Sequence, residues 1–143
     1  MNSNAKDTQR RKRVSFNSYY FEQAIRNGKS FSMSETFAHI NEINLWGARE
    51  SESGEGSTAE QTGILADRLP RLFSEFGIRS IVDAPCGDLN WILPCLESID
   101  RYVGCDILPD LIEQNEKNYG SLSKAVFLCT DISQWGGRNY LGQ

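Results

Sequence analysis

The sequence lacks any apolar run near the roughly 18 residues that cross a bilayer, and its first residues lack the apolar stretch of a secretory signal. We therefore expect no membrane partner and a cytoplasmic location. Charge of one sign does not dominate either, because 15 Lys and Arg face 19 Asp and Glu. With 143 residues, of which 39% are hydrophobic, the chain is expected to form one small domain with a modest core.

Patterns that bind metals are also missing. The four cysteines, Cys86, Cys95, Cys105 and Cys129, include no C-x-x-C pair, and His39 is the only imidazole. Structural zinc sites need paired spacings of such ligands. We therefore predict no metal site, reduced and mostly buried thiols, and a structural role for His39.

Glycine motifs that bind phosphate groups are absent as well. No G-x-G-x-x-G follows a predicted strand, and no G-x-x-x-x-G-K-[ST] occurs in the chain. Both motifs present backbone N–H groups to phosphate oxygens. Their absence argues against a nicotinamide-dependent or nucleotide-phosphate enzyme.

Residues 1–31 are predicted to form a basic, partly disordered N-terminal segment. The cluster at residues 10–13 reads RRKR, but such a run is more often a solvated tail than a nucleic-acid contact, and the rest of the chain is acidic. We therefore expect no nucleic-acid partner. The aromatic residues that follow predict a short amphipathic helix that Gly28 ends.

Residues 32–78 are predicted to be a helical segment with a Gly/Ser-rich loop. Ser34 is expected to cap a first helix, and Ser57 with Glu60 matches the S-x-x-E capping box of a second helix. The loop from Glu50 to Thr58 separates the two helices; it is either a flexible linker or part of a site.

The second helix is predicted to begin near Ala59 and to end at Gly77. Pro70 is expected to divide it into two segments, because proline has no N–H for the helical ladder. Its apolar residues are expected to face a core. These residues are Ile64, Leu65, Leu69, Leu72, Phe73 and Phe76.

The stretch from Ser80 to Trp91 is central to the sequence. A short β-favouring run ends at Asp83, and the turn that follows contains Asp88. In open α/β sheets, ligands bind where the first strand meets its loop. Because two carboxylates bracket this loop and would repel phosphate, the pattern predicts a cationic ligand.

The run DAPCGDLNW within this stretch resembles the first motif of class I S-adenosylmethionine-dependent methyltransferases, in a branch that reads Asp-x-Pro-Cys-Gly-Asp-x-x-Trp. Pro85 and Leu89 stand where many methyltransferases have Gly, so the match is to the branch. S-adenosylmethionine carries an ammonium and a sulfonium, which accords with the two carboxylates. The upstream pattern of the branch matches at Trp46, Gly47, Glu50, Ser51, Ser53, Gly54, Gly56, Ser57, Gln61 and Thr62.

Two further strands are predicted, from Tyr102 to Asp106 and from Ala125 to Cys129. Asp106 follows the first loop by about twenty positions, where nucleoside-binding α/β folds place an acid on the ribose hydroxyls. The other interpretation of Asp106 is a charge at the N-terminus of the helix that begins at Pro109. By resemblance, Asp131 would contact the adenine amino group, or it is an ordinary loop carboxylate.

The resemblance thus implies S-adenosylmethionine as cofactor and a set of residues that bind it. The cofactor-binding residues would be Asp83, Pro85, Cys86, Gly87, Asp88, Asp106, Ile107, Asp131 and Ile132. A loop over the cofactor or substrate would include Trp46, Ser53, Gly54, Gly56, Ser57 and Thr62. No catalytic base can be named, and the methyl acceptor is unknown.

The expected fold is α/β, a Rossmann-like methyltransferase fold that is incomplete. Residues 79–132 would supply about three parallel strands with helices, after the N-terminal helical segment, and residues 133–143 form an atypical tail without a fourth-strand pattern. This predicts a truncated or frameshifted product whose first strand is an open edge, which an oligomer or a partner chain could cover.

Two functions from different classes follow. The first is a methyltransferase-like domain that transfers a methyl group to an unknown acceptor. The second is a non-catalytic S-adenosylmethionine-binding module, or a vestigial fragment without turnover. Methyl transfer by the isolated chain distinguishes them.

Overall fold

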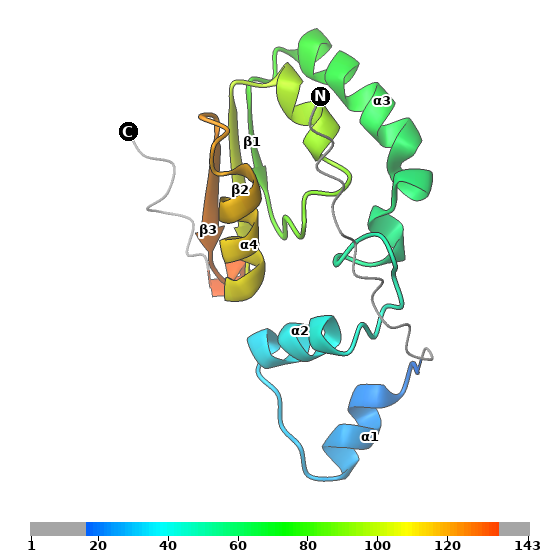
Figure 1. Cartoon of the computed structure of the whole chain (residues 1–143). Coiled ribbons are helices and arrows are strands. Elements are labelled where there is room, and N and C mark those ends of the chain that lie inside the picture. The colour runs from blue at the N-terminus through cyan, green and yellow to red at the C-terminus, as the bar shows by residue number, and fades with distance from the viewer. Residues whose placement is uncertain (1–16, 135–143) are drawn as a thin grey trace.

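The computed structural model describes residues 17–134 (Figure 1). The basic cluster at residues 10–13 and the tail beyond residue 134 lie outside this range, so the expectations about them concern residues that are not described. The helices and strands are α1 (Tyr20–Arg26), α2 (Met33–Glu42), α3 (Ala59–Phe76), β1 (Ser80–Asp83), β2 (Arg101–Asp106), α4 (Pro109–Tyr119) and β3 (Ala125–Cys129). Short 3-10 turns are η1 (Glu55–Ser57), η2 (Leu93–Ser98) and η3 (Ile132–Gln134).

The strands form a parallel sheet in the order β1-β2-β3, which confirms the predicted mixed α/β architecture. The register places Val82 opposite Val103, and Val103 opposite Val126. Each parallel connection crosses one face of the sheet, through η2 between β1 and β2 and through α4 between β2 and β3. All carboxyl ends of the strands therefore point to the same side, toward α2 (Figure 1).

The core lies between one face of the sheet and the elements α3, η2 and α4. Tyr102 of β2 and Phe127 of β3 pack there against Phe73 of α3, Leu96 of η2 and Ile112 of α4. On the opposite face, Val82 and Val126 are 49% and 46% exposed. Among the described residues, no helix covers this face and β1 is an edge strand, as the sequence predicted.

No helix within residues 17–134 is long and apolar enough to span a membrane. Within the same range, Cys86, Cys95 and Cys105 are buried free thiols and Cys129 is an exposed one. The prediction of mostly buried thiols is therefore confirmed.

The cap predicted for α2 at Ser34 is wrong by two positions. Ser32 is the N-cap: its Oγ accepts a hydrogen bond from the Glu35 N–H (3.2 Å), and Glu35 Oε2 accepts one from the Ser32 N–H (2.7 Å). A capping box needs Glu three positions after the cap, and Ser34 has Phe37 there instead.

The capping box predicted at Ser57 and Glu60 is also wrong. Ser57 belongs to η1, and Thr58 is the N-cap of α3. The Thr58 side chain makes no capping bond, and its hydroxyl donates to the Glu55 carbonyl at 2.9 Å. Glu50 Oε1 accepts the Ala59 N–H instead, at 2.8 Å. Bonds from Asn90 and from this N–H hold the pKa of Glu50 below its usual value.

Helix α3 is continuous through Pro70, so the predicted break is wrong. Proline lacks the N–H that would bond the carbonyl of Ala66, four residues earlier. The Cys95 thiol of η2 donates to that carbonyl instead, with Sγ···O at 3.5 Å. A donor from a neighbouring element therefore satisfies the carbonyl that Pro70 leaves without its helical partner.

The prediction that all the apolar residues of α3 face a core is wrong for most of them. Phe73 is buried and Leu69 packs against the core, in line with Thr62 and Ala66 along one helical stripe. The other apolar residues of α3 lie outside this stripe, on other faces of the helix. Ile64, Leu65, Leu72 and Phe76 are exposed.

We predict that Cys95→Ala destabilises the fold by about 1–3 kcal/mol, because it leaves a small cavity and an unbonded carbonyl at Ala66. Adding Pro70→Ala supplies an N–H to that carbonyl. Urea unfolding of the single and double variants should therefore show a larger stabilisation by Pro70→Ala when Cys95 is absent. Equal effects in both backgrounds would refute the role of the thiol.

Candidate functional site

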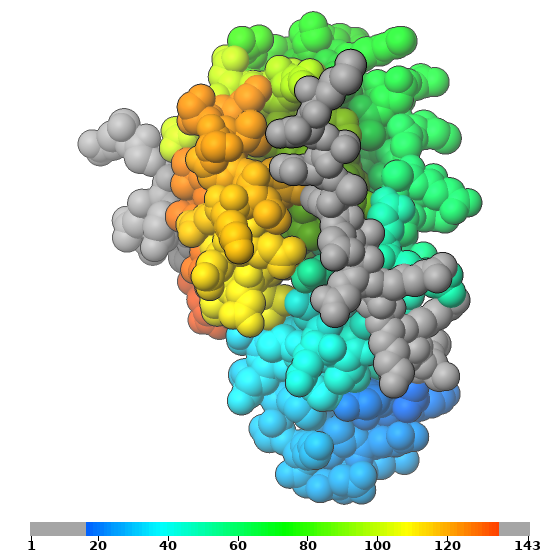
Figure 2. Space-filling model, in the orientation of Figure 1, coloured from blue at the N-terminus to red at the C-terminus, as the bar shows by residue number. Residues whose placement is uncertain are grey.

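A cavity of about 370 Å³ lies at the carboxyl ends of β2 and β3. This volume is within the range of small-molecule sites. Helix α2, cyan in the space-filling view, lies directly below α4 in yellow (Figure 2) and contributes to the opposite wall. The lining residues are Met33, Phe37, Asn41, Trp46, Glu52, Ser53, Ser57, Pro85, Gly87, Cys105, Asp106, Ile107, Leu108, Leu111, Thr130, Asp131 and Ile132.

Asp106, the last residue of β2, is a buried carboxylate in this lining, with 6% of its surface exposed. Its Oδ2 accepts the Gly87 N–H and its Oδ1 accepts the Leu108 N–H, both at 3.1 Å. Each carboxylate oxygen has a second lone pair, so Asp106 can still accept hydrogen bonds from a diol. The bond to Leu108, the N-cap of α4, also fits the interpretation of a helix N-terminal charge.

The loop after β1 is fixed by its neighbours. The Cys86 N–H donates to the Cys105 carbonyl of β2 at 2.8 Å, and Asn115 Nδ2 of α4 donates to the Gly87 carbonyl at 2.7 Å. Gly87 has φ 56°, a conformation that L side chains rarely adopt. The loop therefore presents its backbone to the cavity at Pro85 and Gly87.

The segment after β3 forms the adjoining wall. The Thr130 N–H donates to the Asp106 carbonyl at 2.7 Å, which ties this segment to the end of β2. Asp131 Oδ1 accepts the N–H (2.9 Å) and the hydroxyl (2.7 Å) of Ser133. Asp131 lines the cavity together with the apolar residues Ile107 and Ile132.

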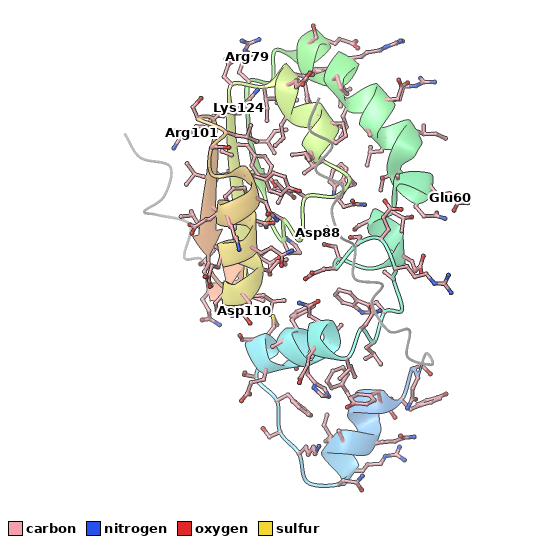
Figure 3. All side chains as sticks on the ribbon, in the orientation of Figure 1. Glu60, Arg79, Asp88, Arg101, Asp110 and Lys124 are labelled. Atoms are coloured by element: carbon pink, nitrogen blue, oxygen red, sulfur yellow. The ribbon has the colours of Figure 1, made fainter. Side chains whose placement is uncertain are left out.

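Asp88 does not line the cavity; it binds the loop that precedes α3 (Figure 3). Its Oδ1 accepts the hydroxyls of Ser51 and Ser53 at 3.0 and 3.2 Å, and its Oδ2 accepts the Glu52 N–H at 2.9 Å. The Asp88 N–H donates back to Ser53 Oγ at 3.1 Å. Asp88 thus holds in place the loop at residues 51–53, which forms one wall of the cavity.

Asp83 and Cys86 also lie outside the lining. Asp83 Oδ2 accepts the Tyr102 hydroxyl at 2.8 Å. Burial raises the pKa of Asp83, against the bond from Tyr102, and the charge of Asp106 adds to the increase. Burial also raises the pKa of the Cys86 thiol, which is therefore neutral and a poor nucleophile.

The raised pKa of Asp83 predicts a pH-dependent effect of Asp83→Asn. A buried carboxyl whose pKa is higher in the folded state favours folding when it is protonated, and this contribution is lost as the pH rises through the folded pKa. The amide can still accept from Tyr102. Asp83→Asn should therefore stabilise the protein at pH 7, and the gain should shrink in urea unfolding at lower pH. A gain that does not change with pH would contradict this assignment.

The loop that was predicted to lie over the cofactor or substrate contributes some of its predicted residues to the lining. Trp46, Ser53 and Ser57 line the cavity, whereas Gly54, Gly56 and Thr62 do not. Gly54 has φ 98° and packs against the Trp46 ring, where an added Cβ would lie 3.4 Å away. Thr62 Oγ1 donates to the Thr58 carbonyl within α3 at 2.8 Å.

The sequence analysis missed the part of the lining that α2 provides. Met33, Phe37 and Asn41 share one face of that helix, and the apolar spacing could have indicated the face but not what it covers. Glu52 was missed because it lies in an irregular loop. The other missed residues are Cys105, Leu108, Leu111 and Thr130.

The negative charge of the lining distinguishes this cavity from sites that bind phosphate groups. Within the part of the chain that the structure describes, the lining contains the carboxylates of Glu52, Asp106 and Asp131 and no Lys, Arg or His. Comparisons with protein-family models, curated proteins and solved structures find no match for this chain. The choice of ligand therefore rests on the chemistry of the cavity, which favours hydrogen-bond donors and cations beside apolar surface.

Proposed function

We propose that the cavity binds S-adenosylmethionine and that the chain forms the cofactor-binding part of a class I methyltransferase-like domain. The observation that carries the proposal is the buried carboxylate of Asp106, held by the Gly87 and Leu108 N–H groups at the end of β2. A carboxylate suits a ribose diol because it offers only acceptors. The parallel order β1-β2-β3 is that of one half of a doubly wound nucleotide-binding sheet.

The neighbouring residues suit the adenine base. Ile107 and Ile132 offer apolar surface on the Asp106 side of the cavity, and Asp131 offers an acceptor for the exocyclic amino group. Apolar surface beside a hydrogen-bond acceptor suits a nucleoside. The nucleoside should carry no phosphates, since three carboxylates would repel a diphosphate.

S-adenosylmethionine supplies an activated methyl group: the nucleophile bonds to the methyl carbon while the carbon–sulfur electron pair stays on sulfur. The residues of the chain would hold the reactants in line and exclude water, because orientation and desolvation accelerate such a transfer. The methyl acceptor would enter beside Phe37 and Trp46, whose rings pack edge to face at 6.2 Å on the α2 side of the cavity.

A non-catalytic S-adenosylmethionine-binding module is the second candidate. It is favoured by the lining, which among residues 17–134 contains no His, Lys or Tyr, and whose carboxylates would be occupied by the donor groups of the cofactor rather than free to accept a proton from the methyl acceptor. Methyl transfer from the labelled cofactor to any acceptor by the purified chain would decide for the enzyme.

Calorimetric titration tests the shared part of both candidates. S-adenosylhomocysteine, the product form, should bind saturably to the purified chain, and NAD⁺ should not, because its diphosphate would meet the carboxylates of the cavity. If the folded chain bound neither ligand, or preferred NAD⁺, the proposal would fail.

A further inference from the structure

Contacts between neighbouring residues define an order along the cavity. At one end, Asp131 follows Thr130, whose N–H donates to the Asp106 carbonyl. The side chain of Asp106 then accepts the Gly87 N–H. Gly87 in turn packs so closely on Ser53 that an added Cβ would lie 1.8 Å from Ser53 Oγ. These contacts place the lining residues in the order Asp131, Asp106, Gly87 and then the loop that contains Ser53.

Glu52 is the carboxylate at the loop end of this row. Its N–H donates to Asp88 Oδ2 at 2.9 Å, which fixes its backbone. Its Oε2 accepts a hydrogen bond from Asn41 Nδ2 of α2 at 3.3 Å, which orients the side chain. Both Glu52 and Asn41 line the cavity. A half-buried carboxylate that is oriented by an amide and lines a cavity is suited to bind a cation.

We propose that Glu52 binds the ammonium group in the amino-acid portion of S-adenosylmethionine, an inference that rests on the proposed function. With the ribose on Asp106 and the adenine toward Asp131, the 5′ substituent leads past Gly87 toward Glu52. That substituent carries the ammonium, and its N–H donors match the carboxylate. Glu52 thereby selects ligands that bear the amino acid.

This assignment gives Asp88 a positioning role. The sequence suggested that Asp83 and Asp88 themselves meet the cation, but both lie outside the lining. Asp88 acts through the Glu52 N–H and the Ser53 hydroxyl, which set the loop against Gly87. The carboxylate that faces the cavity is that of Glu52.

The test compares two adenosyl ligands, S-adenosylhomocysteine and 5′-deoxy-5′-methylthioadenosine, which lacks the amino acid. Calorimetry should show that Glu52→Gln weakens binding of S-adenosylhomocysteine by about tenfold or more, the effect of losing a charge-assisted hydrogen bond. Binding of methylthioadenosine should stay within about twofold of wild type, which also shows that the variant is folded. Glu55→Gln is the matched control, because Glu55 is exposed in the same loop and does not line the cavity.

The outcomes separate the inference from the proposed function. If Glu52→Gln weakens both ligands equally or leaves S-adenosylhomocysteine unchanged, the role of Glu52 is wrong while the nucleoside site stands. An equal loss in Glu55→Gln would likewise overturn it, because the effect would then be one of general loop charge. If wild-type protein binds neither ligand, the proposed function itself fails.

Discussion

Replacement of Asp106 by Asn is expected to weaken binding of S-adenosylhomocysteine about 100-fold. The variant loses the two charge-assisted hydrogen bonds that one carboxylate oxygen would accept, one from a backbone N–H and one from a ribose hydroxyl. The carboxylate accepts the Gly87 and Leu108 N–H groups, and in the proposed complex it also accepts the ribose hydroxyls. An amide at this position replaces one acceptor oxygen by a donor, which faces other donors. The dissociation constant can be measured by calorimetry.

Asp110→Asn is the matched control for Asp106→Asn. Asp110 is an exposed acid in the first turn of α4, outside the cavity (Figure 3). Its replacement should leave binding within about twofold, because the Asp110 side chain is exposed and does not line the cavity. A similar loss of affinity in both variants would mean that Asp106 contributes net charge rather than a specific contact.

Gly87→Ala is expected to lower the free energy of unfolding by about 2–4 kcal/mol and to abolish cofactor binding. Two costs combine at this position. The backbone has φ 56°, and the added Cβ would meet Ser53 Oγ at 1.8 Å and Ser53 Cβ at 2.9 Å. Relief of the clash would push Ser53 and Glu52 away from the loop, which would remove one wall of the cavity. Urea unfolding and calorimetry measure the two effects.

Gly63→Ala is a control whose expected effect on stability is opposite to that of Gly87→Ala. Gly63 lies inside α3, and an added Cβ there would meet nothing within 4 Å. Because alanine favours helix more than glycine does, this variant should be more stable by up to about 1 kcal/mol and should bind normally. If Gly87→Ala were as stable as Gly63→Ala, the close packing of the first loop on Ser53 would be disproved.

The strands and α4 were predictable from the sequence because their signals are local. The β-favouring runs at residues 80–83, 102–106 and 125–129 are short and bounded by turn residues, and the structure has strands there. Pro109 at the first turn of α4 gave the start of that helix. The positions of Asp106 and Asp131 could be predicted for the same reason. Each lies at or just after the end of a strand, and the strand ends were predictable.

Two of the errors, at Pro70 and at the start of α3, occurred where distant residues override local rules. Pro70 should break a helix, but the Cys95 thiol satisfies the carbonyl that the proline leaves without its helical partner. Ser57 and Glu60 have the spacing of a capping box, but Glu50 bonds the first N–H group of α3. Neither partner can be identified from the sequence, since each depends on how separate elements pack.

The candidate site was likewise predictable only in part. The sequence predicted that carboxylates surround a cationic ligand, but it could not tell which carboxylates face the cavity. Asp83 turns toward Tyr102 and Asp88 toward the loop at residues 51–53. Glu52 lines the cavity, with its N–H bonded to Asp88 and its carboxylate bonded to Asn41. A residue in an irregular loop has no periodicity from which its direction could be predicted.

Titration of the ¹⁵N-labelled chain with S-adenosylhomocysteine, followed by amide NMR spectra, tests the central claim most directly. We expect saturable shifts at the amides of Gly87, Ile107 and Ile132, which belong to three residues of the cavity lining. Amides of α1, which contributes nothing to the lining, should not shift. A dispersed spectrum that does not change with ligand, or changes confined to residues outside the lining, would contradict the account.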